Sequence, residues 1–222
     1  MKNQGSVAIV DFKMGNLFSI SNACEYVGLS PVITSDVKQL MACDAAILPG
    51  VGAFGEAMHN LEKLDLVRPV KDFIASGKPF MGICLGLQLL FSCSEEFGYH
   101  EGLDVIRGEV KKFPAKDENN NSVKVPLIGW NRIRFKNDDR ATALLRGIDD
   151  GDYMYFVHSY YVVPIEVAKI LTVTNYAGIE YCSSVHDGNV VAFQFHPEKS
   201  AWKGLAVYSN FKDLVNRRKK ND

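Results

Sequence analysis

Residues 80 to 88 read Phe80-Met81-Gly82-Ile83-Cys84-Leu85-Gly86-Leu87-Gln88. The apolar run before Cys84 predicts a short buried strand, and the run after it predicts one face of a helix. Cys84 then stands on the sharp turn between them, which is the nucleophile position of a nucleophile elbow. Glycine on either side of the cysteine suits such a turn, because backbone segments approach each other closely there. A buried structural cysteine is the competing interpretation, and the glycines alone leave the two about level.

The segments on the N-terminal side of this stretch alternate between strand and helix patterns. This order predicts an α/β fold with a mostly parallel central sheet flanked by helices. In such a sheet the active groups gather where strands end, and Asp11, Pro49-Gly50-Val51-Gly52 and Cys84 all follow predicted strands. The predicted strands span residues 7–10, 31–34, 45–48 and 79–83, and the predicted helices span residues 16–27, 54–64, 66–76 and 85–91.

The segments on the C-terminal side are rich in β-branched and aromatic residues, which predicts an additional antiparallel β section. A polar stretch at residues 117–122 predicts an exposed loop, and apolar spacing at 204–218 predicts a closing helix. No linker composition interrupts the chain, so we expect a single domain over residues 1–222. The predicted strands span residues 105–113, 130–135, 153–156, 159–163, 170–174 and 190–195.

The composition argues against several classes of function. The 222 residues carry a net charge of -1, so the charge gives no reason to expect a nucleic acid or an anionic membrane as partner. The five cysteines show no Cys-x-x-Cys pair or zinc-like spacing, and we expect no disulfide framework, metal or cofactor. The sequence shows no signal-peptide pattern and no apolar segment of membrane-spanning length, so we expect a cytoplasmic protein.

A cysteine nucleophile needs a base, and the base needs an acceptor that orients it. His196-Pro197-Glu198 follows the apolar strand pattern of residues 190–195, which brings an imidazole and a carboxylate to the edge of the sheet. Alone, this tripeptide is more often a loop than a catalytic pair, but the elbow cysteine favours the catalytic interpretation. We interpret the other histidines as structural, and keep only the last of them as a supporting residue near the site: His59, His100, His186 and His158.

An acyl-transfer site also needs donors for an oxyanion, and these are usually backbone amides. The amide of Leu85 follows the nucleophile directly, and the glycines of Pro49-Gly50-Val51-Gly52 let an amide of that loop point inward. A tight strand-to-helix turn explains the same glycines and proline. Without Cys84, that simpler interpretation of the loop is the better one.

In this order and near these spacings, the motifs resemble the class I (triad-type) glutamine amidotransferases. Each motif is modest alone, and the ordered set is highly specific. The resemblance covers essentially the whole chain and implies the flavodoxin-like α/β fold of that class. The motifs are Pro49 to Gly52, Gly82 to Gln88 and His196 to Ser200. Further matches, to the glutaminase subunits of imidazole glycerol phosphate synthases, lie at Asp11 with Met14 to Leu17, at Gly129 to Asn131 and at Tyr155 to Tyr160.

The resemblance implies that Cys84 attacks the side-chain amide of free glutamine and forms a glutamyl thioester, which water hydrolyses to glutamate. His196 is implied as the base that protonates the leaving ammonia, and Glu198 as the group that orients it. The remaining roles are implied in the same way: oxyanion amides at Val51 and Leu85, glutamine binding at Gly50, Gly52 and Gln88, and a partner interface at Asn16, Trp130, Asn131 and Lys199.

The resemblance also implies a heterodimer, in which ammonia passes through a tunnel to a (β/α)8 cyclase subunit of histidine biosynthesis. That partner makes imidazole glycerol phosphate and an aminoimidazole carboxamide ribotide. A loop amide that points away in the isolated subunit keeps glutaminase activity low until the partner rearranges the Gly50-Val51-Gly52 loop.

Three departures from the family pattern lie in or near the segments expected to meet the partner. Lys13 replaces a glycine, Leu127-Ile128 replaces His-Met, and Trp202 adds a bulky aromatic side chain. They leave open a related glutaminase that supplies ammonia to another synthase, such as one that aminates or amidinates a surface-polysaccharide sugar. Less favoured are a catalytically silent subunit that stabilises its partner and a cysteine hydrolase acting on peptides.

Overall fold

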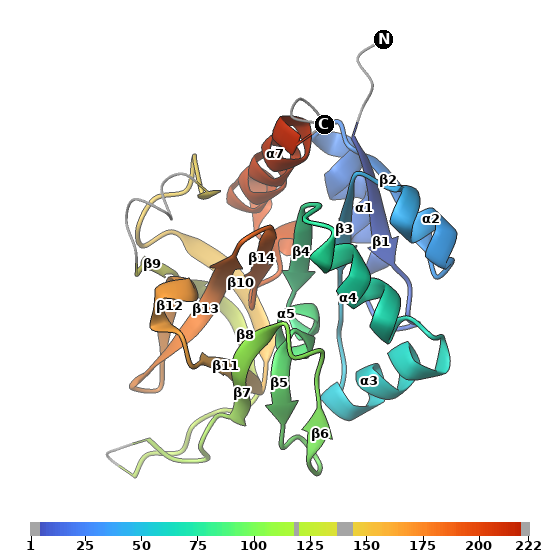
Figure 1. The fold of residues 1–222 in the computed structure, drawn as a ribbon. Helices are drawn as coiled ribbons and strands as arrows, with labels where there is room; N and C mark the ends of the chain where they lie inside the picture. Colours follow the sequence, from blue (N-terminus) through green and yellow to red (C-terminus); the bar gives the residue numbers. More distant parts are fainter. Residues whose placement is uncertain (1–4, 118–119, 137–143, 219–222) are drawn as a thin grey trace.

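The computed structural model describes residues 5–117, 120–136 and 144–218. Figure 1 shows a twisted sheet with helices packed on both faces of one half and antiparallel strands in the other half. The 12-stranded sheet has the order β2-β1-β3-β4-β14-β13-β11-β7-β5-β6, and β12 joins it through β13 and carries β9 on its other side. β8 and β10 form a separate two-stranded antiparallel sheet.

In the parallel half of the sheet, the central strands β3, β4 and β14 are short and are buried and apolar along their whole length, because helices cover both faces. Side chains of β1 alternate between the faces: Ala8 and Val10 pack with α2, α3 and α4, whereas Val7 and Ile9 pack with α1 and α7. The strands of this half are β1 (Ser6–Val10), β2 (Ser30–Thr34), β3 (Ala45–Leu48), β4 (Phe80–Ile83) and β14 (Val190–Phe193). The helices are α1 (Leu17–Tyr26), α2 (Val37–Ala42), α3 (Phe54–Lys63), α4 (Val67–Ala75) and α7 (Ala201–Arg218).

The pairing of β4 with β14 decides where the site forms. The two strands run parallel, and Ile83 lies opposite Phe193 at their carboxyl ends. The backbone amide of Cys84 continues this pairing and donates a hydrogen bond to the Phe193 carbonyl, 2.7 Å away. Residues far apart in the sequence, Cys84 and His196, therefore leave the sheet side by side.

The other half of the sheet is mainly antiparallel, with β5 and β7 as a parallel pair. Its strands are β5 (Phe91–Ser94), β6 (His100–Glu101), β7 (Ile106–Lys112), β9 (Arg134–Phe135), β11 (Tyr160–Pro164), β12 (Ile170–Tyr176) and β13 (Ile179–Asp187). The two-stranded sheet consists of β8 (Leu127–Arg132) and β10 (Tyr153–His158). The described residues also contain the short helical turns α5 (Leu85–Leu89), η1 (Val167–Lys169) and η2 (Pro197–Lys199).

The structure confirms the predicted α/β fold with a parallel sheet and an antiparallel section, and it corrects several elements. The helix expected over residues 85–91 ends at Leu89, because Phe91 already belongs to β5. The strand expected over 130–135 is divided between β8 and β9, and α7 begins three residues earlier than predicted, at Ala201. The sequence analysis missed α2, β5, β6 and β13. Residues 118 and 119 of the predicted polar loop lie outside the described residues.

The missed strand β13 contains buried polar side chains, which hide its apolar pattern. Ser183 and Ser184 are fully buried, and both hydroxyls lie within hydrogen-bond distance of the Thr172 hydroxyl on β12, at 2.8 and 2.6 Å. Burial without a partner would destabilise these hydroxyls, so the pairing makes a polar strand possible inside the sheet. Within the described residues, no helix has the length and apolar character needed to cross a membrane.

Candidate active site

Cys84 occupies a strained turn between β4 and α5. Its backbone lies at φ 55° and ψ −109°, a region that residues other than glycine rarely adopt. A methyl group at Gly86 would lie 1.9 Å from the Leu48 carbonyl oxygen, and one at Gly82 would lie 3.0 Å from the Ala192 Cβ. The structure places Cys84 on the predicted turn between strand and helix, and glycine at position 86 is what allows α5 to start against β3.

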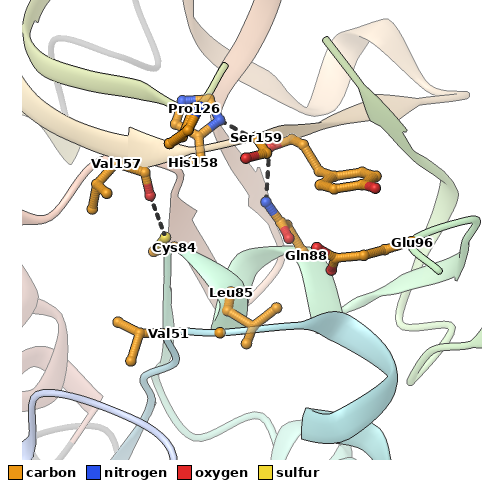
Figure 2. A pocket seen from close by; sticks show the side chains of 11 residues that line it. Val51, Cys84, Leu85, Gln88, Glu96, Pro126, Val157, His158 and Ser159 are labelled. Atoms are coloured by element: carbon orange, nitrogen blue, oxygen red, sulfur yellow. Dashed lines mark hydrogen bonds between the residues drawn. The ribbon is translucent and has the colours of Figure 1, made fainter.

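The Pro49-to-Gly52 loop packs directly on this elbow. A Cβ at Gly50 would lie 2.8 Å from the Leu85 Cβ, and Gly52 has a φ of +107°, which disfavours other residues. Val51 is 43% exposed and lines the same cavity as Cys84 and Leu85. Figure 2 shows Val51 and Leu85 on one side of Cys84 and Val157 on the other. The structure thus brings the two predicted oxyanion residues to Cys84.

A clamped turn holds His196 beside Glu198. The imidazole Nδ1 lies 2.8 Å from the Glu198 Oε1, and both side chains are almost fully buried. The His196 amide donates to the Tyr155 carbonyl, and the Ser200 hydroxyl donates to the His196 carbonyl at 2.7 Å. Gly204 in α7 packs on the Pro197 carbonyl oxygen, which a Cβ at that position would approach to 1.8 Å. The turn therefore fixes the predicted base and its orienting carboxylate.

The electrostatics of His196 couple it to Cys84. Burial disfavours the charged imidazolium, but the nearby Cys84 sulfur and the Glu198 carboxylate outweigh burial and raise the pKa of His196 to about 10. The outer ring nitrogen, Nε2, is buried and has no hydrogen-bond partner among the described residues. The imidazole thus has one nitrogen bound to a carboxylate and the other free for proton transfer at the sulfur.

A cavity of about 260 Å³ opens in front of Cys84. Gln88 lines it and donates from Nε2 to the Tyr160 carbonyl at 2.9 Å. Glu96 also lines it; this carboxylate is buried and accepts a hydrogen bond from the Phe54 amide at 2.7 Å. Figure 2 shows Glu96 next to Gln88. The cavity is lined by Val51, Gly52, Cys84, Leu85, Gln88, Glu96, Pro126, Val157, His158, Ser159 and Tyr160.

The sequence analysis missed Glu96. In the sequence, Glu95-Glu96 looks like an exposed acidic pair after a strand. The structure instead leaves Glu95 exposed and buries Glu96. The Glu96 amide donates a hydrogen bond to the Ser94 hydroxyl, and the Glu96 carboxylate accepts one from the Phe54 amide. A buried carboxylate in a small cavity points to recognition of a cationic group.

His158 lines the cavity as a neutral imidazole. Its Nδ1 lies 2.8 Å from the Tyr160 carbonyl, which can only accept, so Nδ1 carries the proton and Nε2 is left to accept from the Tyr181 hydroxyl at 3.3 Å. Burial among Phe113, Phe156 and Tyr181 lowers the pKa of His158 to about 4, helped by the charge of His196. The residue supports the cavity wall, as expected for a residue near the site.

The four predicted interface residues lie on β8, on η2 and at the start of α1. Trp130 is 52% exposed on β8, lies opposite Tyr155 and packs against its ring edge to face. Lys199 in η2 lies 5.9 Å from the same ring. Asn131 donates to the Asn175 carbonyl, and Asn16 caps α1, which contacts η2. Among the described residues, no group of three His, Cys, Asp or Glu side chains is arranged to hold a metal.

Comparison with known proteins agrees with this geometry. The family model for glutamine amidotransferase class-I matches residues 8–212. A relative from Aquifex aeolicus, named imidazole glycerol phosphate synthase subunit HisH, is 50% identical over 205 residues, covering 92% of this chain and 94% of the relative. A HisH of Moorella thermoacetica is 47% identical over 209 residues, covering 94% and 95%.

Solved structures share the fold at low sequence identity. PurLQS from Thermotoga maritima matches with a TM-score of 0.71 at 18% identity, covering 97% of this chain and 99% of that chain. A putative GMP synthase subunit from Thermoplasma acidophilum matches with a TM-score of 0.70 at 16% identity, covering 100% and 98%. The chain is thus an enzyme that belongs to the class I glutamine amidotransferase family.

Proposed function

We propose that the chain is the glutaminase subunit of an imidazole glycerol phosphate synthase. It hydrolyses glutamine to glutamate and ammonia, and the ammonia passes to a (β/α)8 cyclase subunit of histidine biosynthesis. The observation that supports this most strongly is the elbow Cys84 beside the buried His196–Glu198 pair, in a chain whose relatives are named HisH. The whole of residues 1–222 forms the single catalytic domain, and the site of action is the cytoplasm.

The reaction begins when the Cys84 sulfur attacks the side-chain amide carbon of glutamine. The amides of Val51 and Leu85 hold the oxyanion that forms. His196, protonated while Glu198 orients Nδ1, gives its Nε2 proton to the leaving nitrogen, and ammonia departs as the glutamyl thioester forms. Neutral His196 then takes a proton from water, and the hydroxide attacks the thioester. Glutamate departs, which restores the Cys84 thiolate and the protonated His196.

The substrate is held at both ends. Gly52 and Gln88 line the cavity, and Gly50 packs against Leu85 beside it, consistent with binding of the glutamine amide by these three residues. Glu96, which the sequence did not indicate, accepts a charge-assisted hydrogen bond from the α-ammonium group of glutamine. A cavity of about 260 Å³ with a buried carboxylate at one end and a nucleophile at the other favours free glutamine over a peptide.

The cyclase partner covers the surface formed by the exposed Trp130 and the neighbouring Tyr155. Trp130, Asn131, Asn16 and Lys199 contact the cyclase, and the partially exposed Val51 loop lies where docking can reorient its amide. The isolated subunit stays nearly inactive because this loop needs the partner to rearrange it.

A second candidate is a glutaminase that feeds another synthase, for example one that modifies a surface-polysaccharide sugar. Lys13 and Trp202, which depart from the family pattern, favour it, because both side chains are exposed near the proposed docking side. Trp202 is 67% exposed, and the Lys13 backbone has a φ of 69°. Reconstitution decides between the two. The first function requires that the chain with a (β/α)8 cyclase forms imidazole glycerol phosphate from glutamine; a stable complex with a sugar-modifying synthase, and none with the cyclase, would support the second.

A further inference from the structure

A chain of two buried amides connects the cavity wall to the nucleophile. Gln88 donates from Nε2 to the Tyr160 carbonyl at 2.9 Å and to the Gln194 Oε1 at 3.2 Å. Gln194 in turn places its Nε2 3.8 Å from the Cys84 Sγ. Gln194 is fully buried, and Gln88 is nearly fully buried.

A backbone carbonyl fixes the direction of this chain. The oxygen and nitrogen of a glutamine amide are hard to tell apart by shape, and their hydrogen-bond partners must decide. The Tyr160 carbonyl can only accept, so the Gln88 nitrogen must face it. That nitrogen also faces Gln194, so the Gln194 oxygen must point to Gln88, and its N–H group must point to the sulfur.

The sulfur is contacted by one acceptor and one donor. The Val157 carbonyl lies 3.7 Å from the Sγ and accepts a hydrogen bond only while the thiol keeps its proton. The Gln194 N–H contact persists in both states and strengthens when the sulfur becomes an anion. A fixed N–H donor at the sulfur therefore favours the attacking thiolate over the thiol.

We propose that Gln194 is a positioning residue that aims an N–H donor at Cys84, stabilises its thiolate and holds the sulfur toward the substrate. The inference rests on the proposed function, since it gives Cys84 the role of nucleophile. His196 stands two residues further along the same chain segment and is the titratable group that faces the sulfur, with Glu198 behind it. The end of β14 thus supplies both the proton donor and the amide that flank the nucleophile.

The test measures iodoacetamide alkylation of Cys84 against pH in the full chain, resolved by peptide mass spectrometry from the other cysteines. Gln194→Leu removes the donor, and we expect the pH of half-maximal alkylation to rise and the rate at pH 7 to fall about tenfold, the size of one hydrogen bond to a charged group. Gln194→Glu keeps the shape but places an acceptor at the sulfur, so its profile moves at least as far in the same direction.

Asn210→Leu is the matched control. Asn210, on α7, is also a buried amide, and it donates a hydrogen bond to the Arg146 carbonyl at 2.9 Å. Both Leu variants lower the melting temperature, and only Gln194→Leu shifts the alkylation profile. Unmoved profiles in both Gln194 variants, with a stability loss like that of Asn210→Leu, would reduce Gln194 to a structural residue. In that case glutamine hydrolysis by the wild-type complex would still support the proposed function. Conversely, a shifted alkylation profile in a chain that never hydrolyses glutamine would refute the proposed function and leave the role of Gln194 standing.

Discussion

Protonation of His158 is predicted to destabilise the fold by a calculable amount. The imidazole is neutral and buried, with Nδ1 donating to the Tyr160 carbonyl and Nε2 accepting from Tyr181. Burial lowers its pKa to about 4, whereas the unfolded chain binds a proton near the ordinary value of 6.5. Stability from the neutral form is therefore complete above pH 6.5 and is lost as the pH falls from 6.5 to 4. The full interval amounts to roughly 3 kcal/mol.

The magnitude at an accessible pH follows from the same two values. At pH 5 the unfolded state is almost fully protonated at this position and the folded state is almost fully neutral. The difference favours unfolding by about 2 kcal/mol at pH 5, against about 0.2 kcal/mol at pH 7. The carboxylates that also titrate in acid contribute equally to wild type and to a variant that lacks only this imidazole.

Urea unfolding of wild type and His158→Gln at the two pH values measures the effect. The variant loses contacts and starts less stable at pH 7, but on moving to pH 5 wild type should lose about 2 kcal/mol more than the variant. His59→Gln, which removes an exposed imidazole on α3, is the control and should follow wild type. A gap between wild type and His158→Gln that stays constant with pH would refute the neutral, buried state of His158.

Three further predictions concern the elbow, the substrate and the base. Gly86→Ala forces a methyl group onto the Leu48 carbonyl and should cost about 3 kcal/mol of stability together with glutaminase activity, whereas Gly188→Ala, at φ +59° with open space around it, should cost about 1 kcal/mol and keep activity; equal losses in urea unfolding would contradict the packing argument. Glu96→Gln should raise the KM for glutamine about tenfold in the complex. It should leave hydrolysis of glutaramate, which lacks the α-amine, unchanged, and a similar loss on both substrates would argue against ammonium recognition. Glu198→Gln should lower kcat about 10²-fold with little change in KM, and a kcat near that of wild type would show that the carboxylate does not orient His196.

The proposed catalytic residues could be named from the sequence because each lies in a local pattern. Gly82 and Gly86 mark a crowded turn on either side of Cys84, and His196-Pro197-Glu198 follows an apolar strand. The parallel sheet could be predicted for a similar reason, since its central strands β3, β4 and β14 are buried and uniformly apolar.

The residues that could not be predicted depend on partners far along the chain. The Glu96 carboxylate can be buried because it accepts a hydrogen bond from the Phe54 amide, which is 42 residues away in the chain. Gln194 meets Cys84 across 110 residues, through the register of β4 and β14. No local pattern distinguishes such polar side chains from exposed ones, and the same reason hid the polar strand β13.

The most direct test of the account compares Cys84→Ala with wild type in the complex with a (β/α)8 cyclase, using glutamine or ammonium salt as the nitrogen source. We expect the variant to lose glutamine-dependent formation of imidazole glycerol phosphate and to keep the ammonia-dependent reaction at the wild-type rate. Persistence of the glutamine-dependent reaction without the Cys84 sulfur would contradict the central claim.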